Sequence, residues 1–241
     1  MKSHPSENYD ERDPSLPVNM IIIHYTGMMD CEEALNRLTD TDPPKKMGKV
    51  SAHYVIDEDG TTYSLVDEEH RAWHAGVAFW EGITDINSAS IGIELVNPGH
   101  SLGYSRFPLA QMQSLIALCK EICERHPIRQ DYVLGHSDIA PGRKKDPGEL
   151  FGWQMLQKSG IGLWPSPNAR DRQLASVYLS SEAKLRSAFA MFGYNPEAEI
   201  EELIVAYNRH FSRSDDEELT SLAAGKLACL IRTKREILNQ N

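Results

Sequence analysis

The feature that most constrains the fold is a short apolar run, Met20-Ile21-Ile22-Ile23, which leaves no polar side chain on either face of an extended segment. Such runs are typical of strands buried on both faces, as in the sheets of α/β proteins. Segments 90–96 and 132–136 predict two more strands, and 52–56 with 62–66 predict a hairpin. Apolar residues recur at helical spacing over 109–123. This alternation predicts an α/β fold with a central sheet.

The two ends of the chain have different patterns from the central part. Residues 1–17 are polar, contain three prolines and predict an N-terminal arm. Two glycines and two prolines between residues 160 and 171 predict a linker, which we place at 165–176. Beyond it all patterns are helical, over about 181–192, 196–210 and 215–237. We therefore expect a main domain over 18–164 and a small three-helix domain over 177–241.

Charge and hydropathy exclude two classes of protein. The chain has 25 basic and 35 acidic side chains and a formal net charge of −10, so we expect no nucleic-acid partner, because binding to phosphates requires a basic surface. No run approaches the roughly 18 apolar residues of a membrane helix, so we expect no integral membrane segment. The polar N-terminus lacks the apolar core of a signal peptide and predicts a cytoplasmic protein. An envelope protein whose leader had been removed would give the same pattern.

Three candidate metal ligands follow predicted strands. His24 ends the first strand, His136 ends the last, and Asp146 lies ten residues after His136. Because strand ends in an α/β layer meet at one crevice, these side chains can converge. Two imidazoles and a carboxylate suit zinc, and three protein ligands leave a fourth position for water, as in catalytic sites. The alternative is that each histidine is a hydrogen-bonded structural residue at its strand end.

Two charged residues are candidates for the chemistry itself. Glu94 interrupts the apolar strand 90–96, and a buried carboxylate needs a cation, a hydrogen-bond donor or a catalytic role. The alternative is an edge strand on which Glu94 faces water. Lys144 lies in the basic loop Arg143-Lys144-Lys145, where a solvated charge is the default interpretation.

Five segments of the chain contain recognisable motifs: Ile22–Thr26, Val50–Tyr54, Ala72–Gly76, Ser90–Glu94 and Gly135–Gly148. In this order they resemble the motifs of the N-acetylmuramoyl-L-alanine amidase type 2 family, which includes peptidoglycan recognition proteins and phage amidases. The resemblance covers about residues 18–164. Ala52 replaces a tyrosine of phage and animal members, and this places the chain in the bacterial branch that has the glutamate.

The resemblance implies a central mixed sheet flanked by helices and a zinc hydrolase that cleaves the amide bond between N-acetylmuramic acid and L-alanine. By position, the zinc ligands are His24, His136 and Asp146. Glu94 is the catalytic proton carrier, and Lys144 stabilises the transition state. The partners implied are peptidoglycan or soluble muropeptides in murein recycling or turnover.

The remaining assignments carry alternatives. Trp73 and His74 are expected to line the substrate cleft, although Trp73 fits a core position equally well. The C-terminal helices resemble a small peptidoglycan-binding domain, but their aromatic residues at helical spacing are typical of a core. A non-catalytic peptidoglycan receptor on the same fold is the competing function, and such proteins usually lack one of the metal ligands.

Overall fold

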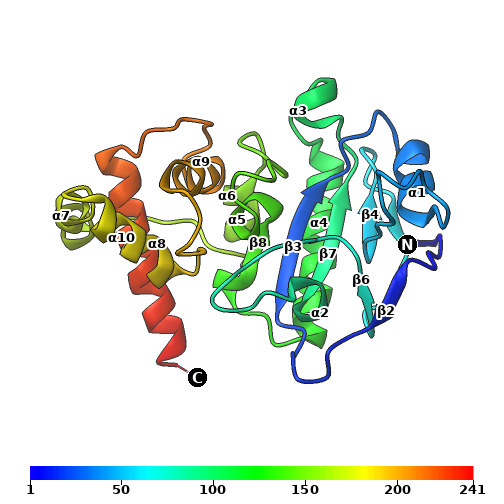
Figure 1. Cartoon of the computed structure of the whole chain (residues 1–241), viewed down its shortest axis with the longest axis horizontal. Helices are drawn as coiled ribbons and strands as arrows, with labels where there is room; N and C mark the ends of the chain where they lie inside the picture. The colour runs from blue at the N-terminus through cyan, green and yellow to red at the C-terminus, as the bar shows by residue number, and fades with distance from the viewer. Residues whose placement is uncertain (241) are drawn as a thin grey trace.

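The protein is described here by a computed structural model covering residues 1–240, in which a six-stranded mixed sheet forms the centre (Figure 1). The strand order is β1-β5-β4-β7-β3-β8. The strands are β1 Lys2–Ser3, β3 Met20–Tyr25, β4 Tyr54–Ile56, β5 Thr62–Ser64, β7 Ser90–Leu95 and β8 Val133–Gly135. β4, β7, β3 and β8 are parallel, and β5 pairs antiparallel with β4 as the predicted hairpin. The predicted α/β fold with a central mixed sheet is confirmed.

Each face of the sheet contributes to its own hydrophobic cluster, because successive side chains of a strand point to opposite faces. Ile21 and Ile23 share one cluster with α4 (Leu109–Arg125) and α6 (Trp153–Lys158). Met20 and Ile22 share the other with the C-terminal helices. α1 (Cys31–Thr39) begins after Asp30, whose side chain caps the helix by accepting a hydrogen bond from the Glu33 amide.

Short elements connect these layers and carry several residues of the site. They are β2 Tyr9–Glu11, β6 His70–Ala72, α2 Ile86–Ala89, α3 Gly99–Leu102, the 3-10 helix Gln130–Tyr132 and α5 His136–Ile139. β2 and β6 form a separate two-stranded sheet. α5 begins directly after β8 and carries a predicted ligand at its first position.

The predicted N-terminal arm, residues 1–17, is not a free arm. β1 adds to the edge of the main sheet beside β5, and β2 pairs with β6. The Arg12 guanidinium donates to the carbonyl oxygens of Asn87, Ser88 and Ser90 at 3.0, 2.6 and 3.1 Å. The polar composition that indicated an arm instead supplies hydrogen bonds to backbone groups of the main domain.

The predicted linker and three-helix tail also differ from the structure, which has four helices between residues 165 and 240. They are α7 Ala169–Tyr178, α8 Glu182–Phe192, α9 Ile200–Phe211 and α10 Ser221–Leu238. α7 occupies most of 165–176 because Asn168 and Asp171 form a capping box, with two reciprocal hydrogen bonds of 3.0 Å. α9 and α10 start four to six residues later than expected. Thr220 caps α10 by accepting from the Ala223 amide.

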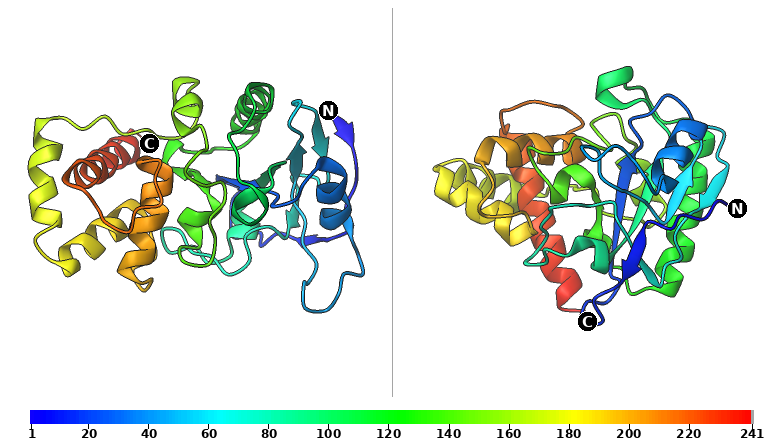
Figure 2. Two further views of the ribbon diagram at one scale, coloured as in Figure 1. Left: turned by 90° about the horizontal axis from the view of Figure 1, so that it is seen from above. Right: turned by 45° about the vertical axis from the view of Figure 1, so that its right-hand side comes forward.

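The C-terminal helices gather at the β8 end of the sheet, and the N-terminus lies at the opposite end (Figures 1 and 2). Their apolar residues, among them Leu203 and Leu227, belong to the same cluster as Met20 and Leu134 of the sheet. The helices therefore share a core with the sheet and are not joined to it by a linker alone. Among residues 1–240, no helix combines the length and apolar character that crossing a membrane requires.

Candidate metal centre and catalytic pocket

Three neighbouring parallel strands bring the predicted site residues to one edge of the sheet. His24 lies near the carboxyl end of β3 and is the register partner of Glu94 on β7. His136 follows β8, the neighbour of β3 on the other side. Asp146 enters from the loop after α5, whose position is fixed by a 2.9 Å hydrogen bond from the Ser137 amide to the Asp146 carbonyl oxygen. Parallel strands end at a common crevice, and here that crevice collects all four side chains.

The predicted ligand atoms form a compact triangle. His24 Nδ1 lies 2.9 Å from His136 Nδ1 and 2.9 Å from Asp146 Oδ2, and His136 Nδ1 lies 3.0 Å from the same oxygen. All three residues are buried, with 1 to 6% of their surface exposed. One cation can contact the three atoms together.

A chain of hydrogen bonds determines which ring nitrogen of His24 faces this triangle. The Ser90 hydroxyl donates to the Ile86 carbonyl oxygen at 2.6 Å and therefore accepts from His74 Nε2 at 3.2 Å. Burial, followed by the nearby His24, lowers the pKa of His74 well below its usual value, so this ring is neutral and its Nδ1 is an acceptor. His74 Nδ1 then accepts from His24 Nε2 at 3.0 Å, which leaves the lone pair of His24 Nδ1 directed at the triangle.

His136 is oriented in the same way by a single backbone acceptor. Its Nε2 donates to the Ala75 carbonyl oxygen at 2.9 Å, so a neutral ring presents the lone pair of Nδ1. When both rings are neutral, the triangle contains two nitrogen lone pairs and a carboxylate oxygen with no proton between them. Three acceptors at about 3 Å repel one another unless a cation lies among them, so the donor set fits a metal ion.

The electrostatics of the triangle agree with this interpretation. Burial, assisted by His136, lowers the pKa of His24 to about 4, so the ring is neutral at pH 7. Burial alone would raise the pKa of Asp146, but His136 and His24 lower it well below its usual value. A neutral imidazole and an ionised carboxylate are the forms that bind zinc.

Glu94 lies beside the triangle in the environment expected of a proton carrier. Its side chain is partly exposed to the pocket, whereas Oε2 is buried and has no hydrogen-bond partner among the described residues. Burial and the charge of Asp146 raise its pKa to about 8, and Lys144 opposes the shift. Glu94 lies on a central strand with neighbours on both sides, so the alternative of a water-facing edge strand does not hold.

The two lysines of the basic loop have different surroundings. Lys144 is half-buried and close enough for its charge to act on both Glu94 and His24, whereas Lys145 is exposed. Arg143 donates to the Ala75 and Val77 carbonyl oxygens, both at 2.6 Å. Arg143 thereby holds the segment that also accepts from His136.

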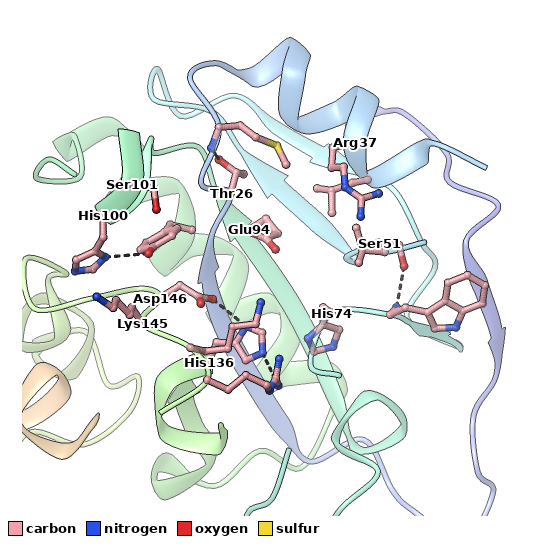
Figure 3. A pocket seen from close by; sticks show the side chains of 17 residues that line it. Thr26, Arg37, Ser51, His74, Glu94, His100, Ser101, His136, Lys145 and Asp146 are labelled. Carbon is pink, nitrogen blue, oxygen red and sulfur yellow. Dashed lines mark hydrogen bonds and ion pairs between the residues drawn. The ribbon is translucent and has the colours of Figure 1, made fainter. Parts of the chain in front are cut away.

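The pocket over this site has a volume of about 510 Å³, and its lining includes Glu94, Lys144 and the ligands His136 and Asp146 (Figure 3). The predicted substrate residues lie at its border but differ in role. Both nitrogens of His74 are used within the protein, so it supports His24 and offers no free ring nitrogen to a ligand. Trp73 also lines the pocket and is only partly buried, and its indole nitrogen donates to Asp10 at 3.0 Å, so the alternative of a core position does not apply.

Ser90 and Gly92 belong to the site, although the sequence analysis did not select them. A Cβ on Gly92 would collide with the His74 ring, so glycine leaves the space in which that ring lies. Ser90, Gly92 and Glu94 alternate along β7 and share one face, while Ile91, Ile93 and Leu95 share the other. A strand that alternates between isoleucine or leucine and three small or polar residues was the signal that could have identified them.

Comparison with known proteins identifies the family of the chain. Residues 14–149 match the family described as N-acetylmuramoyl-L-alanine amidase. The N-acetylmuramoyl-L-alanine amidase AmiD of Escherichia coli K12 is 37% identical over 219 residues, which cover 80% of this chain and 75% of that protein. The 1,6-anhydro-N-acetylmuramyl-L-alanine amidase AmpD of the same organism is 34% identical over 167 residues, 64% of this chain and 88% of AmpD.

Solved structures extend the likeness to nearly the whole chain. AmpDH3 from Pseudomonas aeruginosa has a TM-score of 0.81 at 30% sequence identity, covering 95% of this chain and 98% of that one. A complex of E. coli AmiD with anhydro-N-acetylmuramic acid-L-Ala-D-γ-Glu-L-Lys has a TM-score of 0.77 with the same identity and coverage. With its motifs, fold and relatives in agreement, this chain belongs to the N-acetylmuramoyl-L-alanine amidase type 2 family.

Proposed function

We propose that this protein is a zinc-dependent amidase that hydrolyses the bond between N-acetylmuramic acid, or its anhydro form, and the L-alanine of the stem peptide. The observation that carries the proposal is the triangle of His24 Nδ1, His136 Nδ1 and Asp146 Oδ2, with sides of 2.9 to 3.0 Å. Zinc bound there would lower the pKa of a water ligand to about 7 and polarise the substrate carbonyl.

Glu94 is the proposed general base and acid. Its carboxylate accepts a proton from the attacking water and then delivers a proton to the nitrogen of the departing L-alanine. A raised pKa suits this exchange, because a group with a pKa near the working pH can both accept and release a proton. Lys144 lines the same pocket, close enough for its charge to act on Glu94, and its ammonium would stabilise the negative charge that develops on the carbonyl oxygen.

The relatives support muropeptides as the substrate class. The AmiD complex contains an anhydromuramyl tripeptide, and a second AmpDH3 structure contains an anhydromuramic pentapeptide. For this chain we propose the same class of soluble substrate, with intact murein as the alternative. The competing function, a non-catalytic receptor, is disfavoured because all three ligand positions are filled.

The test combines metal analysis with product identification. Purified protein should contain one zinc per chain, and His136→Ala should contain much less. The wild type should convert the anhydromuramyl tripeptide into anhydro-N-acetylmuramic acid and a peptide with a free L-alanine amine, identified by mass spectrometry. Tight tripeptide binding without cleavage by the zinc-loaded protein would support the receptor function instead. Insoluble murein in a parallel reaction distinguishes the two substrates.

A further inference from the structure

A second buried carboxylate lies two residues beyond the proposed ligand His136. Asp138 is fully buried and accepts three hydrogen bonds, each of 2.7 Å. One comes from the Gly135 amide in the same turn. The other two come from the C-terminal helical region, from the Tyr194 hydroxyl to Oδ1 and from His210 Nδ1 to Oδ2. Asp138 therefore joins the turn that carries His136 to a different part of the chain.

The hydrogen bond from the Gly135 amide to Asp138 fixes the backbone on the N-terminal side of His136. Oδ2 of Asp138 holds the amide immediately before the ligand, and the Ser137 amide immediately after it donates to the Asp146 carbonyl oxygen. A Cβ on Gly135 would lie 2.7 Å from Pro147 and 3.4 Å from Trp153, so this turn has little room to shift without the side chains around it moving. The Asp138 carboxylate thus helps to set the backbone position from which the His136 side chain extends.

The surroundings of His210 show that its contact with Asp138 has no substitute. The ring is stacked between Trp153, at a centroid distance of 3.7 Å, and Phe211, at 3.8 Å, and is 2% exposed. Within residues 1–240 its Nε2 has no hydrogen-bond partner, so Asp138 is the one polar group that the imidazole contacts by a hydrogen bond. Placing such a polar ring among aromatic residues is costly, and the charge-assisted bond to Asp138 offsets that cost.

Tyr194 completes the arrangement from the loop after α8. It is 1% exposed, and burial together with Asp138 raises the pKa of its hydroxyl well above the usual value. The hydroxyl therefore remains protonated and donates to the carboxylate. Without the donors of Tyr194 and His210, the buried carboxylate would keep a single partner, and rotation of the Asp138 side chain would release the Gly135 amide.

We propose that Tyr194 and His210 are positioning residues for the metal ligand His136, acting through the carboxylate of Asp138. This inference rests on the metal site of the proposed function. It gives the C-terminal helices a part in assembling the metal centre, in addition to any contact they make with murein. Direct hydrogen-bond partners of metal ligands change metal affinity by about 10- to 100-fold, and these residues act one step further away.

A pair of buried tyrosines provides a matched test. Tyr194→Phe removes the hydroxyl that binds Asp138, whereas Tyr207→Phe removes an equally buried hydroxyl that donates to the Ala223 carbonyl oxygen at 2.9 Å. Both variants should lose similar stability in urea. Only Tyr194→Phe should weaken cobalt(II) binding, by roughly 3- to 10-fold, with a changed cobalt absorption spectrum. Affinity is measured by chelator competition on protein freed of metal and reloaded with cobalt.

His210 gives a second comparison with a built-in rescue. His210→Leu removes the donor and should weaken cobalt binding by roughly tenfold. His210→Asn retains an amide donor near the position of Nδ1 and should restore most of the affinity. Wild-type affinity and spectrum in Tyr194→Phe, or equal losses in the two tyrosine variants, would overturn the inference, and this comparison suffices if His210→Leu does not fold. Failure of the wild type to bind one cobalt would overturn the proposed metal site as well.

Discussion

Glu94→Gln should make the metal-free protein more stable while removing its activity. The carboxyl has a folded pKa of about 8 against an ordinary value of 4.5, because it is buried and close to Asp146. A carboxyl whose pKa is raised by folding destabilises the native state once the pH exceeds the unfolded value, and the penalty grows until the pH passes the folded value. Glutamine has nearly the same shape and no charge, so it avoids this penalty.

The expected size of the gain follows from the two pKa values. The difference between the folded and unfolded pKa values predicts that Glu94→Gln raises the free energy of unfolding by about 3 kcal/mol at pH 7 and by less than about 1 kcal/mol at pH 5. These are upper values, because the side chain is partly exposed to the pocket and water lowers the penalty. Turnover should meanwhile fall by about 10²- to 10⁴-fold, which is the usual contribution of a general acid–base group.

Urea unfolding at pH 5 and pH 7, with a chelator present, measures the stability difference. Glu58→Gln is the control, since it makes the same chemical change at an exposed carboxylate in a turn, away from the site. A Glu94→Gln protein that is less stable than wild type at pH 7, or whose gain does not increase between pH 5 and pH 7, would refute the reasoning. Normal turnover in Glu94→Gln would refute the catalytic assignment independently.

The lysine pair, one strand glycine and the metal each provide another test. Lys144→Ala should lower kcat/KM by about 10²- to 10³-fold, as loss of an oxyanion donor does, and Lys145→Ala should leave it nearly unchanged; equal losses would contradict their assignment. Gly92→Ala should displace the His74 ring and weaken metal binding by about 10- to 100-fold in chelator competition; unchanged affinity would argue against the Ser90–His74–His24 chain. Chelation should lower the wild-type Tm by about 8–16 °C, from about 4 kcal/mol of binding energy at thousandfold metal excess; an equal drop in His136→Ala would contradict the assigned site.

The sequence predicted those parts of the site that depend on strand ends. His24, Glu94 and His136 each lie at or just beyond the carboxyl end of a strand, and the apolar pattern located those strands to within two residues. Parallel strands end at one edge of the sheet, so the convergence of these three side chains follows from the topology. The family resemblance then supplied the expected roles of these residues in metal binding and catalysis, which neither composition nor spacing could provide.

The supporting contacts could not be predicted in the same way, because they join residues without a regular spacing. His74 meets His24 at a separation of 50 residues, and His210 meets Asp138 at 72. Similarly, the polar segment 1–17 and the linker at 165–176 were identified by composition, which does not show whether a polar side chain finds a partner elsewhere. Arg12 finds such partners in the carbonyl oxygens of Asn87, Ser88 and Ser90, and Asp171 finds one in Arg232.

The two faces of β7 show how a strand can carry a destabilising buried carboxylate. Ile91, Ile93 and Leu95 are completely buried against the α4 side, and each such side chain contributes roughly 1.5–3 kcal/mol. The opposite face carries a serine, a glycine and a carboxylate, none of which strengthens the core. Because the two faces alternate with a period of two, the strand is held by one set of side chains while the other remains available for chemistry. The destabilising Glu94 can therefore persist in the centre of the sheet, since the residues on either side of it hold the strand in place.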